Sequence, residues 1–269
     1  KVRNHGVDLS IDYGKQISKD FTLQFKGTFT FARNKVLEYD EAPGLRPGMK
    51  TVGRRLNTFL GYVTNGLYEN YTDVEESPTS TLGNIAISPG DIKYVDQPDA
   101  NGNYDGRITS DDRVEIGDPW IPEIVYGFGP SMRWKNWDFS FFFQGQTNVS
   151  LIMENFEPFG ERSARGVLAW IADDYWSPDH PNVNAKHPRL TRLTNNHNMQ
   201  VSTYWLRDAS FLKLKNVELG YSYKKARFYI SGSNLLTISP FKHWDPEVGT
   251  GAGMQYPTQR IFNLGIQMS

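Results

Sequence analysis

Apolar and polar residues alternate along several stretches of this chain, and this is the period of a β-strand with one apolar face. The first two stretches follow each other closely, and their apolar residues occupy every second position. They are Val7, Leu9, Ile11 and Tyr13, followed by Phe21, Leu23, Phe25, Phe29 and Phe31. We predict a strand over each stretch and a short polar turn at residues 14–20 between them.

The clearest hairpin is predicted where the parity of the apolar positions changes. Apolar residues hold even positions from Ile124 to Trp134, and after Lys135-Asn136 aromatic residues hold odd positions from Trp137 onward. A two-residue turn pairs the two tryptophans and brings both apolar sets to one face of the sheet. The same pattern predicts a hairpin that turns near residues 224–226 and a last strand over Phe262–Met268.

Such alternation occurs in soluble sandwiches, where the apolar face points inward, and in transmembrane barrels, where it faces lipid. Here the polar positions are often small or uncharged, as at Thr28 and Ser140. Short turns alternate with long connections near residues 34–56, 147–203 and 239–258. These features favour an all-β fold of antiparallel transmembrane β-barrel strands with short periplasmic turns and long extracellular loops. A soluble β-rich carbohydrate-binding or glycan-hydrolysing domain is the alternative.

Composition narrows the classes of function. The 269 residues carry 29 basic and 30 acidic side chains, so no broad basic surface predicts binding of nucleic acid. There is no cysteine, which excludes disulfides and cysteine-based zinc sites. No stretch approaches the roughly 18 consecutive apolar residues of a transmembrane helix, so any membrane span must be made of strands.

Short motifs recur in a fixed order along the second half of the chain. They are Pro89-Gly-Asp-Ile-Lys-Tyr94, Asp112-Arg-Val-Glu-Ile-Gly-Asp-Pro119, Phe142-Phe-Gln-Gly145, Leu206-Arg-Asp-Ala-Ser-Phe211, Ser231-Gly-Ser-Asn-Leu-Leu236 and Trp244-Asp-Pro-Glu247. In their order and spacing, this part resembles the C-terminal part of the SusC/RagA family of TonB-dependent outer-membrane transporters. Departures from the family pattern are Ala209 in place of Gly, a lengthened Asn/Asp loop and the final Ser269.

The resemblance implies that residues 1–269 are the C-terminal part of a transporter barrel, without the plug domain, the earlier strands or the segment that contacts TonB. It implies TonB-energised import of an oligosaccharide or a peptide, with a SusD-like lipoprotein as partner at the extracellular mouth. The chain is therefore expected in the cell outer membrane, in contact with lipid, and not as an enzyme. Because apolar residues hold every even position from Phe262 to Met268, we also expect one further, aromatic residue after Ser269.

An Asn/Asp-rich loop, predicted to be extracellular within residues 89–119, resembles a calcium-binding loop. With Asn101 as position 1, oxygen ligands fall at the spacing of an EF-hand loop and Gly106 takes the turn position. The candidate ligands are Asn101, Asn103, Asp105, the carbonyl of Arg107, Thr109 and Asp112. A turn whose side chains bond only its own backbone is the alternative, and no other cofactor is predicted.

The long connection at 147–203 carries aromatic residues that suit contact with a sugar. Trp170, Tyr175 and Trp176 are the candidate substrate-binding residues, and packing within the loop is the alternative. The same loop holds carboxylate and histidine pairs, namely Asp173 with Asp174 and His180 with His187. We predict neither catalysis nor metal binding from these pairs, because a proline-rich loop does not hold them in fixed geometry.

Overall fold

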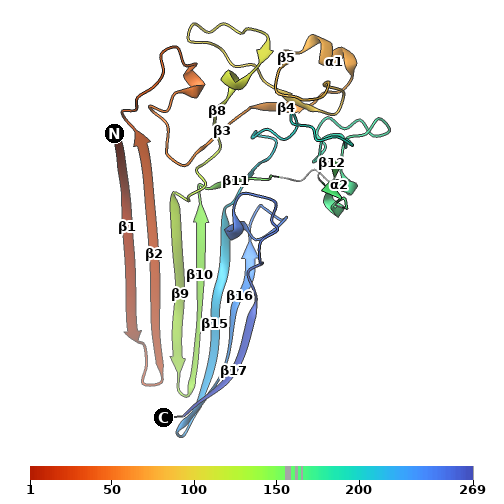
Figure 1. Ribbon diagram of the computed structural model, residues 1–269. Helices are drawn as coiled ribbons and strands as arrows, with labels where there is room; N and C mark the ends of the chain where they lie inside the picture. The colour runs from red at the N-terminus through yellow and green to blue at the C-terminus, as the bar shows by residue number, and fades with distance from the viewer. Residues whose placement is uncertain (155–158, 161–162, 165, 269) are drawn as a thin grey trace.

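The computed structural model describes residues 1–154, 159–160, 163–164 and 166–268. Its main element is a seven-stranded antiparallel sheet in the order β1-β2-β9-β10-β15-β16-β17, which forms the wall of long strands in Figure 1. These strands are β1 (Val2–Gln16), β2 (Phe21–Val36), β9 (Ile124–Trp134), β10 (Trp137–Thr147), β15 (Phe211–Tyr223), β16 (Ala226–Ile238) and β17 (Ile261–Met268). Strands that are neighbours in the sheet follow each other in chain order, as the barrel-strand prediction requires.

The register of the predicted hairpins is confirmed. Trp134 lies opposite Trp137, and Phe128 lies opposite Phe143. Lys135 and Lys224 have φ angles of 53° and 54°, the left-handed conformation that a two-residue hairpin turn uses. The predicted turn at 14–20 was too long, because Gly14, Lys15 and Gln16 continue to pair with β2 and leave only residues 17–20 to turn.

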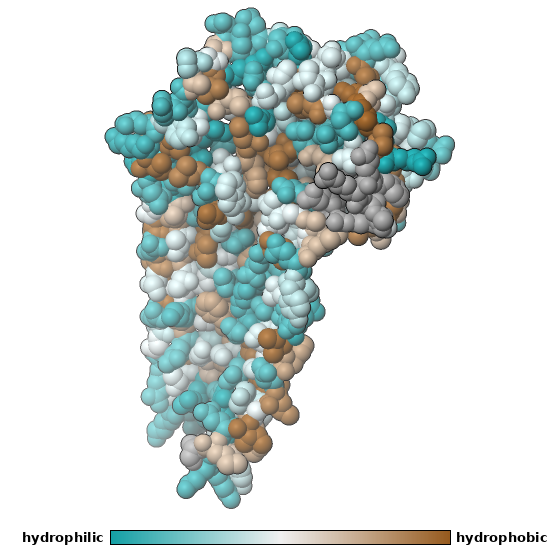
Figure 2. Space-filling view, viewed as in Figure 1, coloured by the Kyte–Doolittle hydropathy of each residue, from teal (hydrophilic) through white to brown (hydrophobic). Residues whose placement is uncertain are grey.

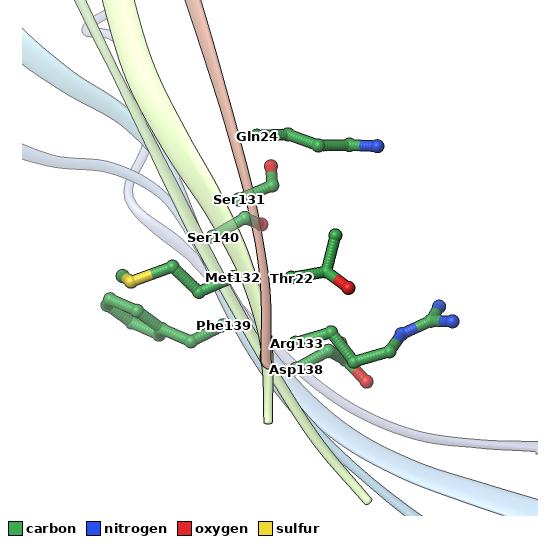
Figure 3. A pocket seen from close by; sticks show the side chains of 8 residues that line it. All are labelled: Thr22, Gln24, Ser131, Met132, Arg133, Asp138, Phe139 and Ser140. Atoms are coloured by element: carbon green, nitrogen blue, oxygen red, sulfur yellow. The ribbon is translucent and has the colours of Figure 1, made fainter. Parts of the chain in front are cut away.

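The two faces of the sheet differ in chemistry, as the alternation predicts. Figure 3 shows the side chains of Gln24, Arg133 and Asp138 on one side of the strands, and those of Met132 and Phe139 on the other. We call the apolar side the outward face and the polar side the inward face. In a transmembrane sheet of this kind, the outward face contacts lipid.

Aromatic rings contact one another along the outward face, and they are not covered by any other described element. Trp137 and Tyr221 lie on adjacent strands with ring centroids 4.7 Å apart. Phe262 and Leu264 on β17 are 75 % and 84 % exposed. An apolar face left open in this way is typical of a surface that lies in lipid, whereas a soluble sandwich buries it.

The short elements gather at one end of the sheet, opposite the short turns (Figure 1). Between β2 and β9 lie the 3-10 helices η1 (Pro47–Met49) and η2 (Ser110–Asp112), helix α1 (Tyr71–Glu76) and the strands β3 (Phe59–Gly61), β4 (Thr64–Leu67), β5 (Thr79–Ser80), β6 (Ile92–Tyr94), β7 (Arg107–Ile108) and β8 (Val114–Ile116). Between β10 and β15 lie β11 (Ser150–Ile152), β12 (Phe159–Gly160), β13 (Ser163–Ala164), helix α2 (Ala169–Asp173) and β14 (Leu206–Asp208), and η3 (Pro246–Val248) precedes β17. None of these short strands joins the seven-stranded sheet within the described chain.

We call the described residues 37–123, 148–154, 166–210 and 239–260 the loop module. It has its own hydrophobic core, in which Ile92, Ile108, Leu151 and Ile171 are fully buried. Hydrophilic residues cover much of its visible surface in Figure 2. The long loops are therefore one folded unit at the end of the wall opposite the short turns. No helix in the described ranges is long and apolar enough to cross a membrane.

Candidate functional site at the loop end of the sheet

Asp91 is the polar centre of the loop module. Its carboxylate is 1 % exposed and accepts two hydrogen bonds from Arg189, at 2.7 and 3.0 Å. The side-chain amides of Asn195 and Asn198 donate to it at 2.9 Å, and so does the backbone N–H of Ser88. A buried carboxylate is tolerated only when its oxygens are occupied in this way. Asp91 therefore ties the Pro89–Tyr94 motif to the segment 189–198.

Gly90, the residue before Asp91, cannot be replaced by a residue with a side chain without strain. Its φ is +84°, and the ring of Trp176 lies 2.3 Å from the place that a Cβ atom would take. A side chain at this position would meet both the left-handed backbone and the indole ring. The motif thus positions Trp176 as well as Arg189.

Two histidines of the module are buried and neutral. The ring Nε2 of His197 lies 2.7 Å from the carbonyl of Ile92, and the ring Nδ1 of His187 lies 2.8 Å from the carbonyl of Pro188. Burial lowers the pKa of His197, and it lowers the pKa of His187 to about 4 although the bond to Pro188 opposes the shift. Since His180 is exposed and His187 is buried, the structure does not make them a metal-binding pair. No group of three or more histidines and carboxylates in the described ranges is arranged to hold a metal ion.

The connection between β16 and β17 is fastened to the inward face of the wall by a buried lysine. The ammonium of Lys213 is 1 % exposed and lies 2.5 Å from carboxylate oxygens of both Asp245 and Glu247. Lys215 reaches Glu247 at 2.9 Å. Burial raises the pKa of the Asp245 and Glu247 carboxyls, but the hydrogen bonds and positive charges around them, with Lys213 foremost, together outweigh it and leave each pKa below its usual value. The two lysines therefore hold this loop against the inward face of the sheet.

A cavity of about 580 Å³ opens where this fastened loop, the module and the wall meet. Its aromatic lining is Phe59 and Trp120, whose ring centroids are 5.4 Å apart, and Trp120 is 49 % exposed. Gln146, which ends the polar row of β10, and Thr250 add polar groups. A space of this size with an aromatic wall and a few polar groups suits an organic solute.

The predicted substrate-binding residues lie apart from this cavity's lining. Trp176 is 7 % exposed and belongs to the core of the module. Trp170 packs against that core with its ring 4.7 Å from the ring of His243, and Tyr175 is half-buried. Trp176 therefore packs inside the loop module, which is the alternative to ligand contact given above. Contact of Trp170 or Tyr175 with a ligand stays a prediction.

The predicted calcium ligands do not all converge. Asn101 and Asn103 are exposed, and their backbone N–H groups bond the carboxylate of Asp99. Asp105 and Asp112 both pair with Arg46, at 2.5 and 2.8 Å. Thr109 and Asp112 form a capping box at η2, while Arg107 follows in β7. The guanidinium of Arg46 supplies positive charge where the loop pattern predicts a metal ion, and calcium binding itself stays a prediction.

No protein-family model matches the chain. "TonB-dependent receptor P3" of Formosa agariphila is 27 % identical over the whole chain, and "TonB-dependent receptor SusC" of Bacteroides thetaiotaomicron is 25 % identical over 99 % of it. The chain is similar over its whole length to the C-terminal barrel part of SusC/RagA-type TonB-dependent receptors. It spans 29 % and 26 % of the length of these two relatives.

Solved structures support the same fold for this receptor portion. "Structure of the RagAB peptide transporter" matches 99 % of the chain with a TM-score of 0.73 and 24 % identity. "Structure of the RagAB peptide importer in the 'open-open' state" matches all of it with a TM-score of 0.72 and 22 % identity. Each match covers 29 % of the solved chain. The membrane-barrel prediction for the strands of the receptor portion is thus confirmed.

The sequence analysis did not identify Phe59 and Trp120, the two aromatic residues that line the 580 Å³ cavity. Phe59 and Trp120 stand in the region 56–122, where the sequence shows no strand periodicity. The available signal was the run Pro119-Trp120-Ile121-Pro122, in which prolines enclose two apolar residues that no neighbouring strand is predicted to bury. Asp118, just before it, is held by Arg55 at 3.0 Å, which fixes the start of this run.

Proposed function

We propose that the chain forms part of the wall and the extracellular mouth of an outer-membrane importer that is energised through TonB. The observation that carries this proposal is a two-faced sheet capped by a folded module, with an open aromatic cavity beside the inward face. An apolar outward face belongs in lipid, and a polar inward face suits a water-filled path. The cavity then lies where a solute first meets that path.

The proposed solute is an oligosaccharide or a peptide, and the proposed partner at the mouth is a SusD-like lipoprotein. Support comes from the likeness to SusC and to RagAB, which is described as a peptide importer. The cavity's chemistry fits either solute, because an aromatic ring stacks on a sugar face as well as on an apolar side chain. A soluble carbohydrate-binding domain is not favoured, since Phe262 and Leu264 stay open on the outward face.

Uptake by the full receptor in its outer membrane tests this proposal. Deleting the receptor should abolish uptake of either a fluorescent oligosaccharide or a fluorescent peptide, and the solute affected gives the substrate class. Trp120→Ala should weaken apparent affinity about tenfold, because loss of one well-packed aromatic contact costs roughly 1.4 kcal/mol. Ile121→Ala is the matched control, since Ile121 is exposed beside it but does not line the cavity. Unchanged uptake of both solutes after deletion would contradict the proposal.

A further inference from the structure

The outward face of the first hairpin carries a cluster of basic side chains at its extracellular end. The antiparallel register of β1 and β2 places Arg3 opposite Lys35 and His5 opposite Arg33. The next pair along the strands is Val7 with Phe31, and the apolar pairs continue from there. Side chains that share parity in paired strands share a face. The four basic residues therefore continue the lipid-facing strip beyond its apolar part.

The height of this cluster matches the edge of a bilayer. From Phe31 to Phe21 the strand takes ten residue steps. At about 3.3 Å per residue and a tilt of about 40°, these steps rise about 25 Å, which is the height of the apolar band of an outer-membrane barrel. Arg33 and Lys35 come directly after this band, so the cluster lies at the level of the outer-leaflet headgroups.

Two members of the cluster, Arg3 and Lys35, have no counter-ion in the part of the chain that the structure describes. Neither Arg3 nor Lys35 has an ion pair or a side-chain hydrogen bond within the described ranges of the chain, although they lie directly opposite each other. Like charges in facing positions of a sheet repel. The carboxylates of β1, Asp8 and Asp12, have the other parity and so belong to the inward face.

The other two members of the cluster, Arg33 and His5, lie beside one aromatic ring. The guanidinium of Arg33 lies 5.6 Å from the centre of the Phe31 ring, and the His5 ring lies 6.3 Å from it. Arg33 is paired with Glu123 at 2.6 Å, but its side chain is 43 % exposed. The uncompensated charge is therefore that of Arg3 and Lys35, and Arg33 stands beside them with its guanidinium still accessible.

We propose that Arg3, His5, Arg33 and Lys35 bind the phosphate groups of an outer-leaflet lipid. The ligand class is a phosphorylated glycolipid or phospholipid headgroup, whose acyl chains continue along Val7 and Phe31. A bound phosphate removes the repulsion between Arg3 and Lys35 and accepts their N–H donors. The lipid is favoured over a free anion because the cluster and the lipid-facing strip form one continuous surface. This proposal depends on the membrane fold and not on the solute that is imported.

Binding of lipid A to the full receptor, purified in detergent and followed by native mass spectrometry, tests the proposal. Wild-type receptor should retain lipid A that carries both phosphates and release the same lipid once the phosphates have been removed. Arg3→Gln with Lys35→Gln should weaken binding about 25-fold, since each basic residue near an anionic lipid contributes a factor of about five. Lys19→Gln with Lys26→Gln, on the same hairpin outside the cluster, makes the same change in charge and should leave binding unaltered.

A charge reversal separates loss of the site from loss of the fold. Lys35→Glu creates an opposite-charge pair with Arg3, so the thermal stability of the receptor should be maintained or rise while lipid A binding is lost. Equal binding of dephosphorylated lipid A, or retained binding in Lys35→Glu, would overturn the proposal. Competition by millimolar inorganic phosphate would also overturn it, because it would indicate a site for free anions. Solute uptake measured in the same variants shows separately whether the proposed import function holds.

Discussion

Asp91→Asn is the sharpest test of how the loop module is held together. The substitution keeps the size of the side chain but removes its charge and turns one acceptor oxygen into a donor. Arg189, 22 % exposed, then loses its counter-ion, and the amides of Asn195 and Asn198 face a group that accepts fewer bonds. Breaking a buried ion pair by removing one partner costs about 3–5 kcal/mol. Because Arg189 keeps some contact with water, we expect the lower end, about 3 kcal/mol.

Hydrogen–deuterium exchange of the full receptor in detergent measures this loss where it occurs. A loss of about 3 kcal/mol corresponds to roughly hundredfold faster exchange at segments 88–95 and 189–198. Exchange in β10 and β15 should stay as in the wild type, because the wall strands do not contact this carboxylate. The matched control is Asp73→Asn, because the Asp73 carboxylate is itself 23 % exposed whereas Asp91 is 1 % exposed, so it should cost less than about 1 kcal/mol. Unchanged exchange at segments 88–95 and 189–198, or equal acceleration in the wall, would refute this account of Asp91.

Three further changes probe other parts of the chain. Because the pKa of buried His187 is lowered from 6.5 to about 4, the module should lose about 3 kcal/mol as the pH falls from 6.5 to 4. This loss should appear as a smaller protection factor, the exchange rate being compared with the intrinsic rate of an unprotected amide at the same pH. Phe141→Arg, on the outward face, should lower folding stability in lipid by about 2–4 kcal/mol, whereas Ser140→Arg on the inward face should be tolerated. Arg46→Gln frees the carboxylates of Asp105 and Asp112, so calcium should bind more tightly by titration calorimetry, and an unchanged affinity would contradict the predicted site.

The strands of the wall were predictable from the sequence. Each strand has one face in an apolar environment and one in a polar environment, so apolar and polar residues alternate along it. The switch of parity across Lys135-Asn136 gave the register of β9 and β10, and the structure pairs Trp134 with Trp137 accordingly. The last strand, Ile261–Met268, begins one residue before the predicted start. Period and turn length are local properties, so one sequence is enough to read them.

The loop module was not predictable in the same way. Its strands are only two to four residues long, which is too short for periodicity to appear. Its stability depends on contacts between distant segments, such as Asp91 with Asn198 and Arg46 with Asp112. An Asn/Asp-rich stretch offers the same residue types to a metal ion, to its own backbone or to an arginine from elsewhere in the chain. Only the three-dimensional arrangement shows that Arg46 reaches Asp105 and Asp112.

Some charged side chains of the wall are paired with opposite charges, and others are not. On the inward face Arg227 is bonded to Asp138 and Glu218, and Gly220 makes room for them, since a Cβ atom there would lie 2.5 Å from Arg227. Charges compensated in this way produce little net field around Arg227. Arg3 and Lys35, on the outward face, face each other without a carboxylate between them. A net charge of -1 for the whole chain hides this contrast. The uncompensated pair of Arg3 and Lys35 therefore identifies a place on the wall where an anion should be retained, whereas the charge of Arg227 is already balanced by its two carboxylates.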